Sequence, residues 1–114
     1  MFELTMTGRV VSVELFKADG RPSVLNVCLV HNRRVGEKEH AEWVSVKFWN
    51  AWGEHLLPHL HKGDRILVRG RPEAKGFARK DGSIAAEFVL HASMMEFLSP
   101  GKRSPDDAEE DDDI

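Results

Sequence analysis

Apolar and polar residues alternate along most of the chain, a pattern that predicts β-strands with one buried face. Five segments carry the pattern, at residues 2–16, 23–31, 42–49, 65–71 and 83–98. Glycine-containing turn signals separate them, and the polar stretches 32–40 and 72–82 are predicted to be loops. Gly8 falls inside the first segment and predicts a bulge or sharp bend there. The pattern therefore predicts a small all-β domain.

Residues 51–61 interrupt this pattern with three leucines spaced for one side of a helix. Pro58 lies within the stretch, and its missing amide donor ends or kinks a helix. We therefore expect only a short helix between the third and fourth strands. Five strands with a helix at that place form the layout of the oligonucleotide-binding (OB) fold. The fold class expected is an all-β, five-stranded OB-fold barrel.

The predicted third and fourth strands separate their side chains by parity into two faces. The inward set is Val44, Val46, Phe48, Ile66 and Val68, and the outward set is Trp43, Ser45, Lys47, Trp49, Arg65, Leu67, Arg69 and Arg71. Two indoles beside a row of cations are costly to expose without a purpose. The alternative is that a tryptophan lies in the core or at an oligomer interface, and that the arginines are only solvated.

Single-stranded nucleic acid is the ligand that this outward face suits. Bases stack on aromatic rings for about 1–3 kcal/mol each, and cations follow the phosphates. The expected stacking residues are Trp43, Trp49 and Phe77. Phe77 lies in a basic stretch with little core to join, and its alternative is packing onto its own hairpin. The expected phosphate-binding residues are Arg33, Arg34, Lys47, Arg69, Arg71, Lys75, Arg79 and Lys80.

The net charge of −3 conceals two oppositely charged parts. Residues 1–104 hold all 16 lysines and arginines and 12 of the acids, a net charge of +4, whereas the last ten residues hold seven acids and no base. A basic body with an acidic tail suggests a polyanion-binding domain joined to an interaction segment. Seven acids in ten residues are expected to stay disordered. The alternative is a tail that only solubilises the chain.

Other chemistry finds little support in the sequence. Cys28 is the single cysteine, so no disulfide within the chain and no cysteine-cluster zinc site is expected. His55 and His59 have the i, i+4 spacing of metal ligands, but Pro58 disturbs their helix and no metalloprotease glutamate accompanies them. We expect no metal, no cofactor and no enzymatic activity. No apolar run approaches the roughly 20 residues that span a bilayer, and we expect a cytoplasmic, nucleoid-associated protein.

The order of several motifs resembles that of bacterial and phage single-stranded DNA-binding proteins over nearly the whole chain. The matching runs are Gly8–Val10, Leu25–Leu29, Trp43–Trp49, Leu60–Gly70, Phe77–Gly82 and the closing Asp111–Ile114. The third of these opens with tryptophan and carries another aromatic six residues on, as the family's third strand does. The fourth contains the family's "leucine, any, lysine, glycine" turn.

The resemblance implies sequence-tolerant binding of single-stranded DNA in replication, repair or recombination, as a homo-oligomer (dimer or tetramer). It places Trp43, Trp49 and Phe77 at the family's stacking positions, and Asp111, Asp112, Asp113 and Ile114 in a tail that binds replication and repair proteins. Three departures stand out. Val35 replaces a further stacking aromatic, the long linker before the tail is missing, and Ile114 ends the chain in place of Pro-Phe.

We expect two parts, an OB-fold DNA-binding domain at 1–98 and a short linker with the acidic tail at 99–114. Two other functions remain open. One is an adaptor that acts mainly through protein partners, resembling primosomal replication protein N. The other is an RNA-binding barrel of the translation or cold-shock kind, which a comparison of matched DNA and RNA oligomers separates because only RNA offers 2′-hydroxyls.

Overall fold

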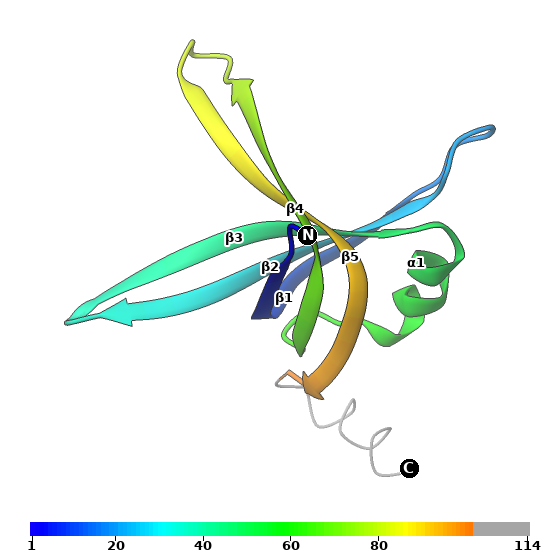
Figure 1. Cartoon of the computed structure of the whole chain (residues 1–114), viewed down its shortest axis with the longest axis horizontal. Coiled ribbons are helices and arrows are strands. Elements are labelled where there is room, and N and C mark those ends of the chain that lie inside the picture. Colours follow the sequence, from blue (N-terminus) through cyan, green and yellow to red (C-terminus); the bar gives the residue numbers. More distant parts are fainter. Residues whose placement is uncertain (102–114) are drawn as a thin grey trace.

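The computed structural model of the chain describes residues 1–101 and contains five strands, one α-helix and one 3₁₀ turn. The elements are β1 (Leu4–Phe16), β2 (Val24–Val35), β3 (Lys38–Trp49), α1 (Asn50–Leu56), η1 (Leu57–His59), β4 (Arg65–Ala78) and β5 (Ile84–Ser99). The strands close into a barrel in the order β1-β2-β3-β5-β4, with α1 between β3 and β4 in the chain (Figure 1). The prediction of a five-stranded OB-fold barrel is confirmed.

The barrel closes because β4 pairs with both β1 and β5, and β5 also pairs with β3. β1 runs antiparallel to both β2 and β4. β5 pairs antiparallel with β4 over a long register and in parallel with β3 only at Ser45–Lys47. The pairing of β1 with β2 shifts register between Val10 and Ser12, which is where the bulge lies. At Gly8 the two strands come close, because a Cβ atom added there would stand 3.1 Å from the Val30 carbonyl oxygen. Gly8 therefore marks a close approach of two strands, and the bulge follows it.

The barrel interior contains the alternate side chains of β3 and β4 that the sequence predicted to point inward. Val46, Phe48, Ile66 and Val68 are fully buried and Val44 nearly so, as predicted. The remaining buried hydrophobics that share this cluster are Val10, Leu25, Val27, Leu29, Leu60 and Leu90. Burying this many branched side chains is the main favourable term for a domain of this size.

The short helix predicted around Pro58 is also confirmed. α1 ends at Leu56, and Pro58 lies in the 3₁₀ turn that follows, where its missing amide donor costs little. The chain turns from β3 into α1 at Asn50, whose φ of 60° is a left-handed conformation that asparagine tolerates better than most residues. Trp52 of α1 packs edge-on against Phe48, with ring centroids 5.0 Å apart, and so ties the helix to the core.

The two stretches predicted as loops, 32–40 and 72–82, are mainly paired strands, and that prediction is wrong. β2 and β3 stay in register to the pair Val35 and Lys38, so only a tight turn at Gly36, with φ 65°, remains. β4 and β5 pair as far as Ala78 with Ile84. Both hairpins extend beyond the barrel (Figure 1). Because both faces of such a hairpin meet water, its sequence lacks the apolar alternation that identifies a half-buried strand.

The expected acidic tail, Asp111, Asp112, Asp113 and Ile114 included, lies outside the described residues, so its disorder and the domain limits at 98 and 99 remain predictions. β5 itself extends to Ser99. Within residues 1–101, no helix is long and apolar enough to cross a membrane.

Candidate nucleic-acid interface

The outer face of β3 exposes both predicted tryptophans. Trp43 is 56% exposed and Trp49 is 37% exposed, so neither ring is enclosed in the core or needed to fill it. On the neighbouring strand β2, Val30 lies opposite Trp43 and Asn26 lies opposite Lys47. Lys47 donates a hydrogen bond from its ammonium group to the Asn26 side-chain oxygen on β2 at 3.3 Å. The predicted outward orientation of residues 43, 47 and 49 is confirmed.

Trp49 is fixed in place by a chain of polar contacts that starts on β5. Its indole Nε1 donates to Nδ1 of His91 at 3.1 Å, and the two ring planes lie 15° apart. The other imidazole nitrogen of His91 lies 3.3 Å from a carboxylate oxygen of Glu73 on β4. Because the indole N–H can only donate, Nδ1 of a neutral His91 must accept this hydrogen bond. The ring proton then lies on Nε2, which donates to Glu73. This hydrogen bond is the largest cause that lowers the pKa of Glu73, with Lys75 adding to it.

The predicted cations of β4 lie at three positions along the strand, on its outer surface. Arg71 stands directly across the strand pair from His91 and is therefore beside the Trp49 contact. Arg69 stands opposite Thr5 of β1 and donates to the Met94 sulfur at 3.5 Å. Lys75 lies 3.6 Å from the Glu73 carboxylate, farther along the β4–β5 hairpin. These side chains are exposed, so they remain available to an anionic ligand.

The other predicted cations lie on the two projecting hairpins, away from the barrel wall. Arg33 and Arg34 of the β2–β3 hairpin lie 3.3 and 3.8 Å from the carboxylates of Glu42 and Glu39. Exposed pairs of this kind contribute about 0–1 kcal/mol, so they exchange readily for phosphate contacts. Arg79 and Lys80 lie at the tip of the β4–β5 hairpin, where the Arg79 amide donates to the Ser83 carbonyl at 2.8 Å. The structure thus spreads the predicted cations over the barrel wall and the two hairpins and does not gather them at one point.

A groove of about 390 Å³ brings Trp43 and Phe77 into one site. Phe77 is 47% exposed and lies on β4, so the two aromatic residues come from segments far apart in the chain. The remaining lining residues are Cys28, Val44, Ser45, Ala86, Glu87 and Phe88. Burial, followed by the charge of Glu87, raises the pKa of the Cys28 thiol, which therefore stays protonated and weakly nucleophilic.

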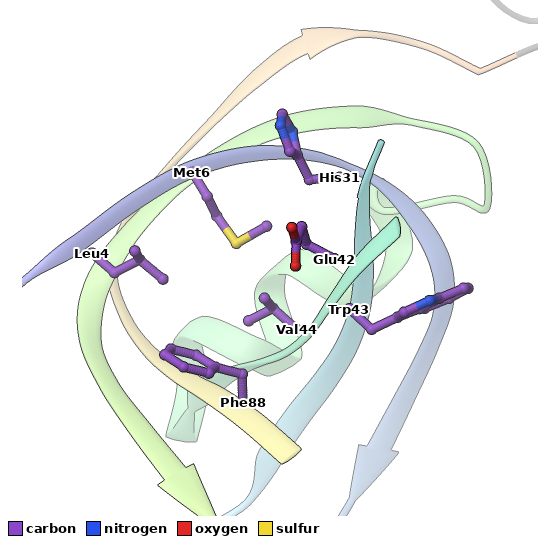
Figure 2. Close-up of a pocket in the computed structure, with 7 residues that line it drawn as sticks. All are labelled: Leu4, Met6, His31, Glu42, Trp43, Val44 and Phe88. Atoms are coloured by element: carbon purple, nitrogen blue, oxygen red, sulfur yellow. The ribbon is translucent and has the colours of Figure 1, made fainter. Parts of the chain in front are cut away.

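A second pocket, of about 300 Å³, opens at the mouth of the barrel and shares Trp43, Val44 and Phe88 with the groove. Leu4, Met6, Val44 and Phe88 point toward one another inside the ring of strands, and Trp43 points away from it (Figure 2). Phe88 is 46% exposed because none of the elements within residues 1–101 covers this end of the barrel. The aromatic surface of Trp43 is therefore continuous with an apolar hollow.

Sequence reasoning missed four side chains of this face, namely Glu73, Glu87, Phe88 and His91. The parity of β5 gave no clear signal for Glu87 and His91, because the neighbouring Val89 and Leu90 are both apolar and both fully buried. Phe88 has the inward parity of Leu90 and was indistinguishable from a core residue. The contact between His91 and Trp49 depends on the parallel pairing of β3 with β5, which no local pattern encodes.

The histidines at residues 55–61 lie in the helix and in the turns that follow it. Within residues 1–101, no group of three or more histidine, cysteine, aspartate or glutamate side chains is placed to hold a metal ion. His55 lies in α1, His59 in the 3₁₀ turn and His61 beyond it. The His61 ring lies 3.7 Å from the Asp64 carboxylate, which also accepts the His61 amide, so its contacts belong to the turn before β4.

Comparison with known proteins gives a consistent assignment. The model of the single-strand binding protein family matches residues 1–98. A single-stranded DNA-binding protein of Chlamydia pneumoniae is 31% identical over 86 residues, covering 72% of this chain and 54% of the relative. One of Chlamydia trachomatis is 32% identical over 73 residues, covering 64% and 46%, and "single-stranded DNA-binding protein 2" of Chlorobaculum tepidum is 28% identical over 97 residues, covering 80% and 65%.

The chain thus spans about half the length of the first two relatives. The family match covers the barrel except for the last residue of β5, and it includes the strands that carry Trp43, Trp49 and Phe77. An OB-fold barrel with an aromatic and basic outer face is the architecture that the resemblance implied. The chain belongs to the single-strand binding protein family.

Proposed function

We propose that this protein binds single-stranded DNA with little sequence preference, by stacking bases on Trp43, Trp49 and Phe77. The observation that carries the proposal is the groove in which Trp43 of β3 and Phe77 of β4 meet, with Trp49 exposed on the same strand as Trp43. Every base has an aromatic face, so stacking tolerates any sequence. The relatives carry the name single-stranded DNA-binding protein, which agrees with this function.

The cations supply the second part of the binding. Lys47, Arg69 and Arg71 lie on the barrel wall beside the stacking residues, and Lys75 stands farther out on β4. Arg33, Arg34, Arg79 and Lys80 lie on the hairpins, which extend from the barrel and are positioned to follow a strand that leaves the groove (Figure 1). Each phosphate contact releases counterions, so affinity falls as salt rises. The protein holds the strand extended and performs no chemistry on it.

The proposal extends to the biological setting that the family resemblance implied. The 1–98 domain binds DNA in replication, repair or recombination in the bacterial cytoplasm, as a homo-oligomer, and residues 99–114 form a linker and an acidic tail. Asp111, Asp112, Asp113 and Ile114 present carboxylates to basic partner proteins, or compete with DNA for the cations of the barrel. Competition predicts that deleting residues 106–114 tightens DNA binding at low salt, and weaker binding by the deletion variant would contradict it.

The central test is a titration of the full chain with a thymine oligomer, followed by tryptophan fluorescence and by anisotropy of a labelled oligomer at several salt concentrations. We expect quenching, because bases stack on Trp43 and Trp49, and a linear fall of log affinity with log salt. A matched RNA oligomer is the control for nucleic-acid type. Absence of quenching with both oligomers would overturn the proposal and favour an adaptor that acts through proteins, and tighter binding of RNA would favour an RNA-binding barrel.

A further inference from the structure

Glu87 is an acidic side chain at the centre of a surface proposed to bind a polyanion. It lies on β5, directly across the strand pair from Lys75, and lines the same groove as Trp43 and Phe77. Its Oε1 accepts a hydrogen bond from the Ser45 hydroxyl at 2.7 Å. Ser45 is the residue between Trp43 and Lys47 on the outward parity of β3, so the carboxylate lies within the aromatic face and not at its border.

The environment of Glu87 differs from that of the other carboxylates near this face. Glu42 has an arginine partner at 3.3 Å, and Glu73 has His91 at 3.3 Å and Lys75 at 3.6 Å. Within residues 1–101, Glu87 has a neutral hydroxyl as its hydrogen-bond partner and no lysine or arginine nitrogen within 4.0 Å. Its Oε2 therefore keeps its full capacity to accept hydrogen bonds from a ligand.

A carboxylate that lines the same groove as two stacking rings disfavours a phosphate there and favours the hydrogen-bond donor edge of a base. An ionised carboxylate accepts hydrogen bonds and repels a phosphate, so the strand must present a base to it and not its backbone. Guanine offers two adjacent donors, N1–H and the N2 amine, that match the two oxygens of a carboxylate. Thymine offers one N–H between two carbonyl oxygens, which a carboxylate repels.

We propose that Glu87, held by Ser45, forms a base-reading subsite in the Trp43–Phe77 groove that favours guanine over thymine. This inference rests on the proposed function and refines it, because stacking remains sequence-tolerant at the other positions. Trp43 and Phe77 hold the base by its faces, and Glu87 accepts hydrogen bonds from its Watson–Crick edge. Cytosine and adenine, with one amine each, take an intermediate place.

The experiment compares thymine oligomers of one length that carry a single central guanine, inosine or thymine, in competition for the full-length protein. A strand with one guanine can slide until that base lies in the groove, so one substitution suffices. We expect guanine to improve affinity by about fivefold, the low end for a bidentate base contact because the groove is open to water. Inosine keeps N1–H but lacks the N2 amine, and is expected to lose most of the gain.

Glu87→Gln is the informative variant, because its amide replaces one of the two acceptors by a donor while keeping the shape. It should bind guanine and thymine oligomers equally well. Glu73→Gln is the matched control, since it removes one negative charge from the same face and should keep the guanine preference whatever its overall affinity. Thermal melting confirms that both variants are folded.

The outcomes separate the two proposals. Failure of every oligomer to bind would overturn the proposed function itself. Binding with equal affinity for guanine and thymine, or a preference that survives in Glu87→Gln, would overturn the base-reading subsite and leave the stacking mechanism in place.

Discussion

Trp43 offers the sharpest test of the stacking mechanism, because its ring does little for the fold. More than half of its surface is exposed, and no hydrogen bond from residues 1–101 holds its indole, whereas Trp49 is less exposed and is bonded to His91. A base stacked on the ring is worth about 1–3 kcal/mol. Trp43→Ala should therefore raise the dissociation constant for a thymine oligomer by about 5- to 150-fold.

The loss of stability should be much smaller than the loss of binding. Replacing an exposed strand residue by alanine costs about 1 kcal/mol or less, so the variant should unfold in urea close to the wild type. Trp43→Phe is the matched control, because it keeps a stacking ring and should recover most of the affinity. Stacking carries no charge, so the slope of log affinity against log salt should be the same in all three proteins.

The assay is anisotropy of a labelled thymine oligomer at fixed salt, repeated at several salt concentrations for the slope. Unchanged affinity in Trp43→Ala would refute base stacking at this position. A large loss of both affinity and stability would show that the ring supports the fold instead. Trp49→Ala is likewise expected to weaken binding by about 1–3 kcal/mol. An unchanged affinity in that variant would place Trp49 at a subunit interface.

Three further predictions concern individual contacts. Arg71→Ala should lower the salt slope by about 0.7, the value for one phosphate contact on a single strand, as measured by titrations at several salt concentrations; an unchanged slope would remove Arg71 from the phosphate path. The pKa of Asp81 lies below its ordinary value of 3.8, mainly because the Ser83 hydroxyl and then the Ser83 amide donate to it. Ser83→Ala should therefore raise that pKa in a carboxyl-carbon NMR titration, and the contact should stabilise the hairpin above about pH 3.8 and lose its effect as the pH falls through the lowered pKa. Gly53→Ala should destabilise the protein by about 1–3 kcal/mol in urea, although alanine favours helices by about 1 kcal/mol, because its methyl group would collide with the Phe48 carbonyl; greater stability in the variant would show that α1 shifts to make room.

The strands of the barrel wall were predictable because one face of each is buried. Val44, Val46 and Phe48 alternate with residues that are exposed or half-buried, and this period of two is visible in the local sequence. The end of the helix was equally predictable, because the missing amide donor of Pro58 is a property of that residue alone. The projecting hairpins were mistaken for loops because their strands are joined by backbone hydrogen bonds, whereas their side chains are exposed on both faces and show no alternating burial. Local patterns report burial, and these segments have almost none.

By itself, the sequence determined the class of the fold, the split between core and surface, and the aromatic and basic character of the outer face, because all three follow from the local alternation of side chains. The tertiary structure alone decided which residues meet on that face. Trp43 joins Phe77, and Trp49 joins His91, only because β3 and β5 run in parallel and close the barrel. Contacts between strands distant in sequence depend on register and closure, which are properties of the whole chain.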